Sequence, residues 1–168
     1  MYKEDIKKAV PYGLLSLAVG SAGSIIVTKL SSFNPYEYTP SFMPPKPVFM
    51  IVWTLLFILM GIANYLINKS SQNSSEDEET NKADTALNTA NHTYYFSLAV
   101  NFIYSIVFFV VKWPFIAFLV CVYLTILVIQ TICQYFEFNK IAAYMNIPYA
   151  IWTAFASILT FAFWWLNW

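Results

Sequence analysis

Charged side chains divide the chain into five long stretches that carry no charge. These stretches cover residues 9–28, 47–68, 93–111, 113–136 and 141–168. Each is long enough for a membrane-spanning helix, which needs about 17–25 mainly apolar residues. Lipid offers the backbone no hydrogen-bond partners, so only helices or closed barrels can span it. Because the apolar runs do not alternate as barrel strands do, the sequence predicts an all-α integral membrane protein, a bundle of five transmembrane helices in the lipid bilayer.

The helices are expected in a single domain with short connections. We place them at about residues 7–29, 47–67, 93–111, 114–136 and 141–166. The residues between the third and fourth helices form a very short turn, so these helices should pack as an antiparallel hairpin. The segment 68–91 is the one clearly hydrophilic stretch, and its composition is that of a flexible loop.

The distribution of lysine favours one orientation. Five spans place the N-terminus, the 68–91 segment and the 137–140 turn on one side, and this side carries Lys3, Lys7, Lys8, Lys69, Lys82 and Lys140. The other side carries only Lys29, Lys46 and Lys112. Positive residues concentrate in cytoplasmic loops. The pattern therefore favours a bacterial cell membrane, with the N-terminal side in the cytoplasm, over a mitochondrial outer membrane.

Residues for conventional catalysis are scarce. His92 is the only histidine and lies beside the hydrophilic segment, while no carboxylate pair lies within a span. Ion pumps and proton relays usually need a charged residue inside the membrane, and the five stretches have none. A lone thiol such as Cys121 behaves mainly as a small apolar side chain. We expect no metal site, no cofactor and no nucleic-acid partner.

Aromatic side chains and isolated polar groups recur at helical spacing within three of the spans. They are Trp53 and Phe57; Asn101, Tyr104 and Ser105; and Tyr149, Trp152 and Ala156. Residues three or four apart share a helix face. Such faces could line a pocket for a planar, largely apolar ligand, with indole rings against its π-surface. Ordinary helix packing, with aromatic residues facing lipid, accounts for the same spacing.

Three segments carry a recognisable pattern. They read PSFMPPKPVFMIVWTLLFILMGIA at 40–63, NFIYSIVFF at 101–109 and IPYAIWTAFASILTFAFWWLN at 147–167. In this order, and over nearly the whole chain, they resemble the translocator protein family, whose members are also called tryptophan-rich sensory proteins or peripheral benzodiazepine receptors.

The resemblance implies a five-helix bundle that is usually a homodimer. It also implies binding of protoporphyrin IX or haem-like tetrapyrroles, of sterols, and of isoquinoline or benzodiazepine-type ligands. Members of the family are reported to promote light-dependent breakdown of protoporphyrin. By motif position, the implied ligand-binding residues are Ser24, Pro44, Pro45, Trp53, Phe57, Asn101, Tyr104, Cys121, Pro148, Trp152 and Ala156.

The chain departs from the family pattern at several positions. Phe42, Phe57 and Tyr104 stand where the pattern has tryptophan, tyrosine and tryptophan, respectively. Each position keeps an aromatic ring but changes its hydrogen bonding. The sterol motif of the animal members needs a basic residue after a tyrosine in the last helix, and no lysine or arginine follows Lys140.

Three functions follow as hypotheses. The first is a membrane receptor or scavenger for tetrapyrroles, with the ligand among the first, second, third and fifth helices under the 30–46 loop. The second is a light-dependent porphyrin-degrading enzyme in which Trp53 and Trp152 are the catalytic residues. The third is a passive transporter of sterol or lipid.

Overall fold

The computed structural model describes residues 3–30, 36–72 and 80–168, without the side chains at 3–6, 24, 26–28, 71–72 and 80–81. Its elements are α1 (Lys3–Leu30), α2 (Lys46–Gln72), α3 (Thr80–Ile106), the short π-helix η1 (Val107–Val111), α4 (Pro114–Phe138) and α5 (Lys140–Leu166). The described residues contain no strand. The prediction of an all-α bundle is therefore confirmed.

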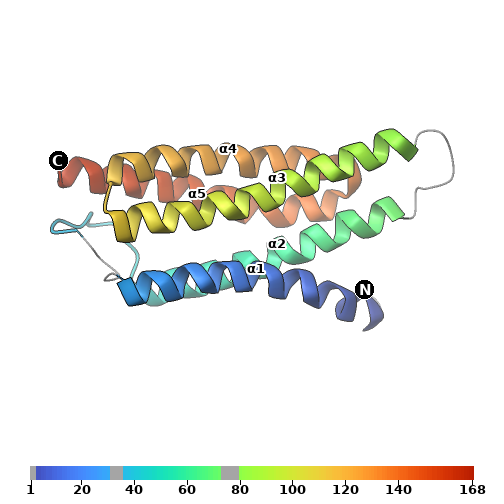
Figure 1. Cartoon of the computed structure of the whole chain (residues 1–168), viewed down its shortest axis with the longest axis horizontal. Coiled ribbons are helices and arrows are strands. Elements are labelled where there is room, and N and C mark those ends of the chain that lie inside the picture. The colour runs from blue at the N-terminus through green and yellow to red at the C-terminus, as the bar shows by residue number, and fades with distance from the viewer. Residues whose placement is uncertain (1–2, 31–35, 73–79) are drawn as a thin grey trace.

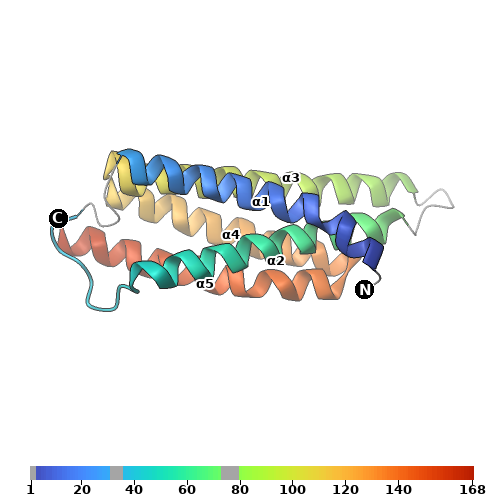
Figure 2. The same cartoon turned by 90° about the horizontal axis from the view of Figure 1, so that it is seen from below.

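The helices run side by side along the long axis of the molecule (Figures 1 and 2). One end, here called the amino-terminal end, holds the start of α1, the end of α2 and the start of α3 (Figure 1). The opposite, carboxy-terminal end holds the C-terminus, the α3–α4 turn and the segment before α2. The most extensive packing is between α4 and α5, followed by α1 with α2 and α3 with α4, so the expected hairpin of the third and fourth helices is present.

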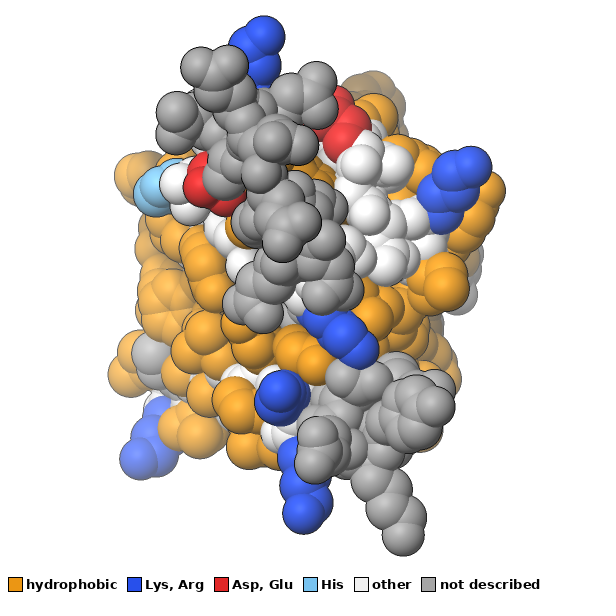
Figure 3. Space-filling model, turned by 90° about the vertical axis from the view of Figure 1, so that its right-hand side faces the viewer, with side chains coloured by type: hydrophobic (Ala, Val, Ile, Leu, Met, Phe, Trp, Pro, Cys, Tyr) orange, Lys and Arg blue, Asp and Glu red, His pale blue; other side chains and the backbone are white. Residues whose placement is uncertain are grey.

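The surface suits a bilayer. Among the described residues, four helical segments are long and apolar enough to cross a membrane: Lys46–Ser70, Lys82–Val111, Pro114–Phe138 and Lys140–Leu166. Several side chains of α1 are not described, so the fifth span stays a prediction. Seen from the amino-terminal end, lysine, acidic and histidine side chains lie among polar atoms, while the flanks are largely hydrophobic (Figure 3). The chain is a multi-pass membrane protein.

The hydrophilic segment is more helical than the sequence predicted. α2 continues to Gln72 and α3 begins at Thr80, so the expectation of a flexible loop over 68–91 is wrong at both of its ends; residues 73–79 lie outside the described residues. Apolar side chains explain the start of α3, because Leu87 and Ala90 pack against a core cluster that includes Ile67. Their spacing of three residues keeps both on one helix face.

A cluster of amides fixes this part of α3 to α2. The Asn64 side-chain amide donates to Asn91 Oδ1 at 2.8 Å and to the Tyr135 hydroxyl at 3.1 Å. Asn68 also donates to Asn91 Oδ1 and accepts from its amide. Buried polar groups require such partners. Asn68 and Asn91, which read as part of a solvated linker, therefore join α2 to α3, and Asn64 extends the cluster to α4.

Glycine lets α1 approach α2 closely. A methyl group at Gly61 would clash with the backbone of Gly13, and one at Gly20 would clash with the ring of Phe57. Ser16, four residues before Gly20, is also small; it is buried and hydrogen-bonded to Tyr94. Small residues at helix contacts are the usual means of close packing in membranes.

The end of α3 is a π-helix, which the sequence did not predict. Val107–Val111 continues the helix with wider turns, and Lys112 then adopts a left-handed conformation with φ of 60°. Pro114 occupies the first turn of α4, where its missing N–H costs no hydrogen bond. The wider turn lies next to the cavity described below, and Phe108 and Phe109 of this turn line that cavity.

Candidate functional site

A cavity of about 610 Å³ lies between α1, α2, α3, η1 and α5. Small-molecule sites in proteins commonly measure about 300–1,000 Å³. The residues that line it fall within 17–23 of α1, 46–57 of α2, 98–109 of α3 and η1, and 156–163 of α5. Met43, in the segment just before α2, also lines it. No described residue of α4 lines it. The helices are those expected from the sequence.

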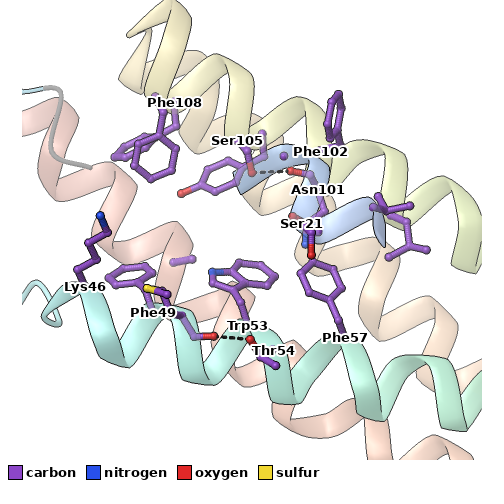
Figure 4. Close-up of a pocket in the computed structure, with 18 of the residues that line it drawn as sticks. Ser21, Lys46, Phe49, Trp53, Thr54, Phe57, Asn101, Phe102, Ser105 and Phe108 are labelled. Carbon is purple, nitrogen blue, oxygen red and sulfur yellow. Dashed lines mark hydrogen bonds between the residues drawn. The ribbon is translucent and has the colours of Figure 1, made fainter. Parts of the chain in front are cut away.

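One wall is a row of aromatic rings on α2. Phe49, Trp53 and Phe57 recur every four residues and project toward the side chains of α3 (Figure 4). The rings of Trp53 and Phe57 are stacked, with centroids 5.5 Å apart and planes at 27°. Gly20 of α1 leaves the space in which the Phe57 ring lies. The wall is therefore flat, apolar and held in place by its own packing.

Neutral polar groups of α3 lie across from this row. Asn101 is buried and donates from its side-chain amide to the Tyr149 hydroxyl at 2.7 Å. One turn further, the Ser105 hydroxyl donates to the backbone carbonyl of Asn101 at 3.2 Å (Figure 4). The hydrogen bond to Tyr149 orients the Asn101 amide, so this residue can offer a fixed polar contact within a mainly apolar cavity.

Tyr104 and Ala156 line the cavity where α3 meets α5. The Tyr104 hydroxyl shares a hydrogen bond of 2.8 Å with Thr160 Oγ1. Its ring is stacked on Phe108 of η1, with centroids 5.9 Å apart and planes at 21°. Because the hydroxyl already has a partner on α5, Tyr104 contributes mainly an aromatic surface.

Trp152 does not line the cavity, although it contacts two residues that do. Its ring meets Phe49 at 5.4 Å and Trp53 at 6.4 Å between centroids, in both cases edge to face. Its indole Nε1 is buried and has no hydrogen-bond partner among the described residues. The structure therefore places Trp53 at the cavity, and Trp152 packs against the aromatic row without being part of the described lining.

Four other sequence candidates are not among the described residues that line the cavity. They are Pro44, Pro45, Cys121 and Pro148. Cys121 is buried, and its thiol lies 3.6 Å from the Thr153 carbonyl oxygen. Pro148 is exposed on α5. The side chain of Ser24 lies outside the described residues, although the backbone there belongs to α1.

The segment before α2 is attached to the bundle beside the cavity. The Tyr36 hydroxyl donates to the Phe108 carbonyl at 2.8 Å, and burial raises the pKa of this hydroxyl above its usual range. Asn167, just after α5, accepts from the Tyr38 backbone N–H at 3.0 Å and donates to the Tyr38 carbonyl at 2.9 Å. Met43 of the same segment lines the cavity. The hydrogen bonds of Tyr36 and Tyr38 therefore hold this segment beside the cavity.

Charge is almost absent from the site. Of the described residues that line the cavity, only Lys46 is charged. The described residues also contain no group of three or more histidine, cysteine, aspartate or glutamate side chains that could hold a metal ion. The arrangement can therefore bind a flat apolar molecule, with few polar contacts to orient it.

Several lining residues were not identified from the sequence. Phe49 precedes Trp53 by four residues and Phe108 follows Tyr104 by four, so extending each helical face by one turn would have found both. Phe102 of α3 and Leu17 and Ser21 of α1 also line the cavity. Nothing in the sequence distinguishes these three from ordinary helix-contact residues.

Comparison with known proteins relates the chain to a single family. Residues 13–166 match the model of the TspO/MBR family. The tryptophan-rich protein TspO of Archaeoglobus fulgidus is 33% identical over 164 residues, which cover 97% of this chain and 99% of that protein. The TspO protein of Chlorobaculum tepidum is 32% identical over 171 residues, with 99% of each chain covered. Mouse translocator protein 2 is 27% identical over 121 residues, 72% of this chain and 70% of its own.

Proposed function

Because the chain belongs to the TspO/MBR family, we propose that it is a membrane receptor or scavenger that binds protoporphyrin-type tetrapyrroles in the cavity between α1, α2, α3 and α5. Membership supports, in broad terms, a receptor role related to tetrapyrroles or sterols. The choice of a tetrapyrrole and of this cavity is our proposal. A homodimer in the membrane, expected from the resemblance, belongs to the same proposal.

The observation that carries the proposal is the stacked pair of Trp53 and Phe57 on one wall, with the oriented amide of Asn101 across from it. A macrocycle presents an extended π-surface, which prefers offset stacking or edge contacts with aromatic rings. The indole of Trp53 and the ring of Phe57 would contact that surface. Asn101 would contact a polar edge, and Tyr104 would add a further aromatic face.

A compact apolar sterol would fill the same volume but would use the flat wall less well. It has no π-surface to place against Trp53, and its single hydroxyl would occupy only one of the polar groups on α3. We therefore expect tetrapyrroles to bind more tightly than sterols. Isoquinoline and benzodiazepine-type ligands are smaller, flat and aromatic, and they should compete for the same site.

The test is a titration of the purified protein with protoporphyrin IX in lipid nanodiscs, followed by quenching of tryptophan fluorescence. We expect saturable binding that weakens when Trp53 is replaced by leucine. The control is Trp113→Leu, because Trp113 is exposed on the short turn before α4. This variant also loses one indole, but from a position that does not line the cavity. Non-saturable quenching, equal in empty nanodiscs, would contradict the proposal.

A second candidate function is light-dependent degradation of the bound porphyrin. It is favoured by the contact of two indoles at the cavity, Trp53 lining it and Trp152 packed edge to face on Trp53. Trp53 would donate one electron to the photoexcited macrocycle, the radical cation left on Trp53 could pass to Trp152, and dissolved dioxygen would be the oxidant that opens the ring. Illumination should then bleach the porphyrin faster with this protein than with an unrelated membrane protein, and the Trp53→Phe variant should lose the difference.

A further inference from the structure

We propose that Lys46 selects ligands that carry a carboxylate, by pairing with that group at the edge of the cavity. The inference rests on the proposed function and adds to it the chemical class of the ligand. The ligand would be a flat hydrophobic molecule with a carboxylate, and the Lys46 side chain would recognise that carboxylate.

The first argument is the composition of the lining. Every other described residue that lines the cavity is apolar or neutral. An ionised carboxylate that enters such a site without a partner loses its hydration and gains little in return. A single ammonium group at the lining changes this balance, because it provides a charge-assisted hydrogen bond.

The second argument is position along α2. Lys46 precedes Trp53 by seven residues, which is two helical turns, so both side chains lie on the same face. At 1.5 Å per residue their Cα atoms are about 10 Å apart along the axis. Figure 4 shows the Lys46 amine on the same side of α2 as Phe49 and Trp53. A flat ligand over Trp53 would therefore extend its edge toward Lys46.

The third argument separates Lys46 from Lys112, another lysine of the carboxy-terminal end. Lys112, in the α3–α4 turn, is exposed and does not line the cavity. Lysines near helix ends in membranes commonly extend their amines toward lipid headgroups. Lys46 is exposed as well, but it lines the cavity, and its long flexible stem lets the amine reach a carboxylate on a bound ligand.

The inference predicts discrimination between acids and their esters. Exposed ion pairs contribute modestly, and charge-assisted bonds at partly desolvated sites contribute more. We expect Lys46→Gln to weaken binding of an acidic ligand by about three- to tenfold. The neutral ester of the same ligand should bind the variant and the original protein equally, because it has no charge to pair.

The experiment compares protoporphyrin IX with its dimethyl ester, using nanodiscs of zwitterionic lipid and tryptophan quenching as the readout. Four proteins are titrated: the original chain, Lys46→Gln, Lys46→Glu and Lys112→Asn. Asparagine tolerates the left-handed conformation of residue 112, so this control removes a lysine charge from the same end without added backbone strain. Repeating the series in nanodiscs with anionic lipid tests whether headgroup phosphate competes for Lys46.

We expect the affinity for the acid to fall in the order original chain, Lys46→Gln, Lys46→Glu, with the ester and Lys112→Asn unaffected and the difference reduced in high salt. Anionic lipid should reduce the acid preference only where Lys46 is present. Equal changes for acid and ester, or no change in either, would overturn the inference while leaving tetrapyrrole binding intact. Failure of the original chain to bind either form would instead contradict the proposed function and the inference with it.

Discussion

The indole rings of Trp53 and Trp152 meet edge to face, with centroids 6.4 Å apart and planes at 90°, yet only Trp53 lines the cavity. The two tryptophans that the family resemblance assigns to one site therefore have different positions in it. Trp53 can contact a ligand directly. Trp152 lies against Trp53 and Phe49, so it can act on a ligand only through those rings.

This difference predicts unequal effects of substitution. Trp53→Leu removes the stacking surface and should weaken protoporphyrin binding by about tenfold, the equivalent of about 1.4 kcal/mol. Trp152→Phe keeps an aromatic ring behind the row and should weaken binding by less than about threefold. Isothermal titration of both variants provides the measurement. A larger loss for Trp152→Phe than for Trp53→Leu would refute the assignment of Trp53 as the contact residue.

Gly61 and Gly13 should respond in opposite ways to the same substitution. A methyl group at Gly61 meets the backbone of Gly13, whereas one at Gly13 meets nothing within 4 Å. Gly61→Ala should therefore lower the free energy of unfolding by about 1–3 kcal/mol through overpacking of α1 on α2. Gly13→Ala should leave it unchanged or raise it slightly, because alanine favours the helix. Thermal unfolding in detergent compares the two variants. An equal loss of stability in both would contradict the close contact between Gly61 and Gly13.

Asn167 should control how quickly a ligand leaves. Its side chain makes both hydrogen bonds to the Tyr38 backbone that attach the pre-α2 segment to the end of α5. Asn167→Ala removes both, at a cost of about 1 kcal/mol, and should raise the dissociation rate about fivefold. Asn167→Asp keeps only the acceptor, so its dissociation rate should lie between those of the original chain and of Asn167→Ala. Stopped-flow release of bound porphyrin measures the rates; an unchanged rate would mean that the segment does not limit exit.

Asn91 should stabilise the fold, although it lies in a segment that reads as a linker. Its Oδ1 accepts from both Asn64 and Asn68. Asn91→Ala should cost about 0.6–1.7 kcal/mol, the range for hydrogen bonds between membrane helices. Asn88 is exposed on the same helix, so Asn88→Ala is the matched control and should be neutral. A neutral Asn91→Ala in thermal unfolding would show that the amide cluster adds nothing to stability.

The fold was largely predictable because uncharged length is a strong constraint in lipid. The start of α4 at Pro114 and the presence of five helices follow from that pattern and from the position of the prolines. The extension of α3 to Thr80 was not predictable from composition. The segment is polar, and its stability depends on contacts across helices, such as that of Asn91 with Asn64.

The site was predictable to the level of helix faces. Spacing and resemblance identified Trp53, Phe57, Asn101, Tyr104 and Ala156, all of which line the cavity. Periodicity cannot tell a residue that faces a cavity from one that packs behind it, which is why Trp152 was grouped with Trp53. The cavity also depends on the π-turn at η1 that positions Phe108, and no local sequence signal marks that turn.

The most direct test of the central claim is an experimental structure of the protein with protoporphyrin IX in lipid. The account predicts density for the macrocycle inside the bundle, against Trp53 and Phe57 on α2 and facing Asn101 on α3. A macrocycle bound on the lipid-facing outer surface, with this cavity empty or filled by side chains, would contradict it.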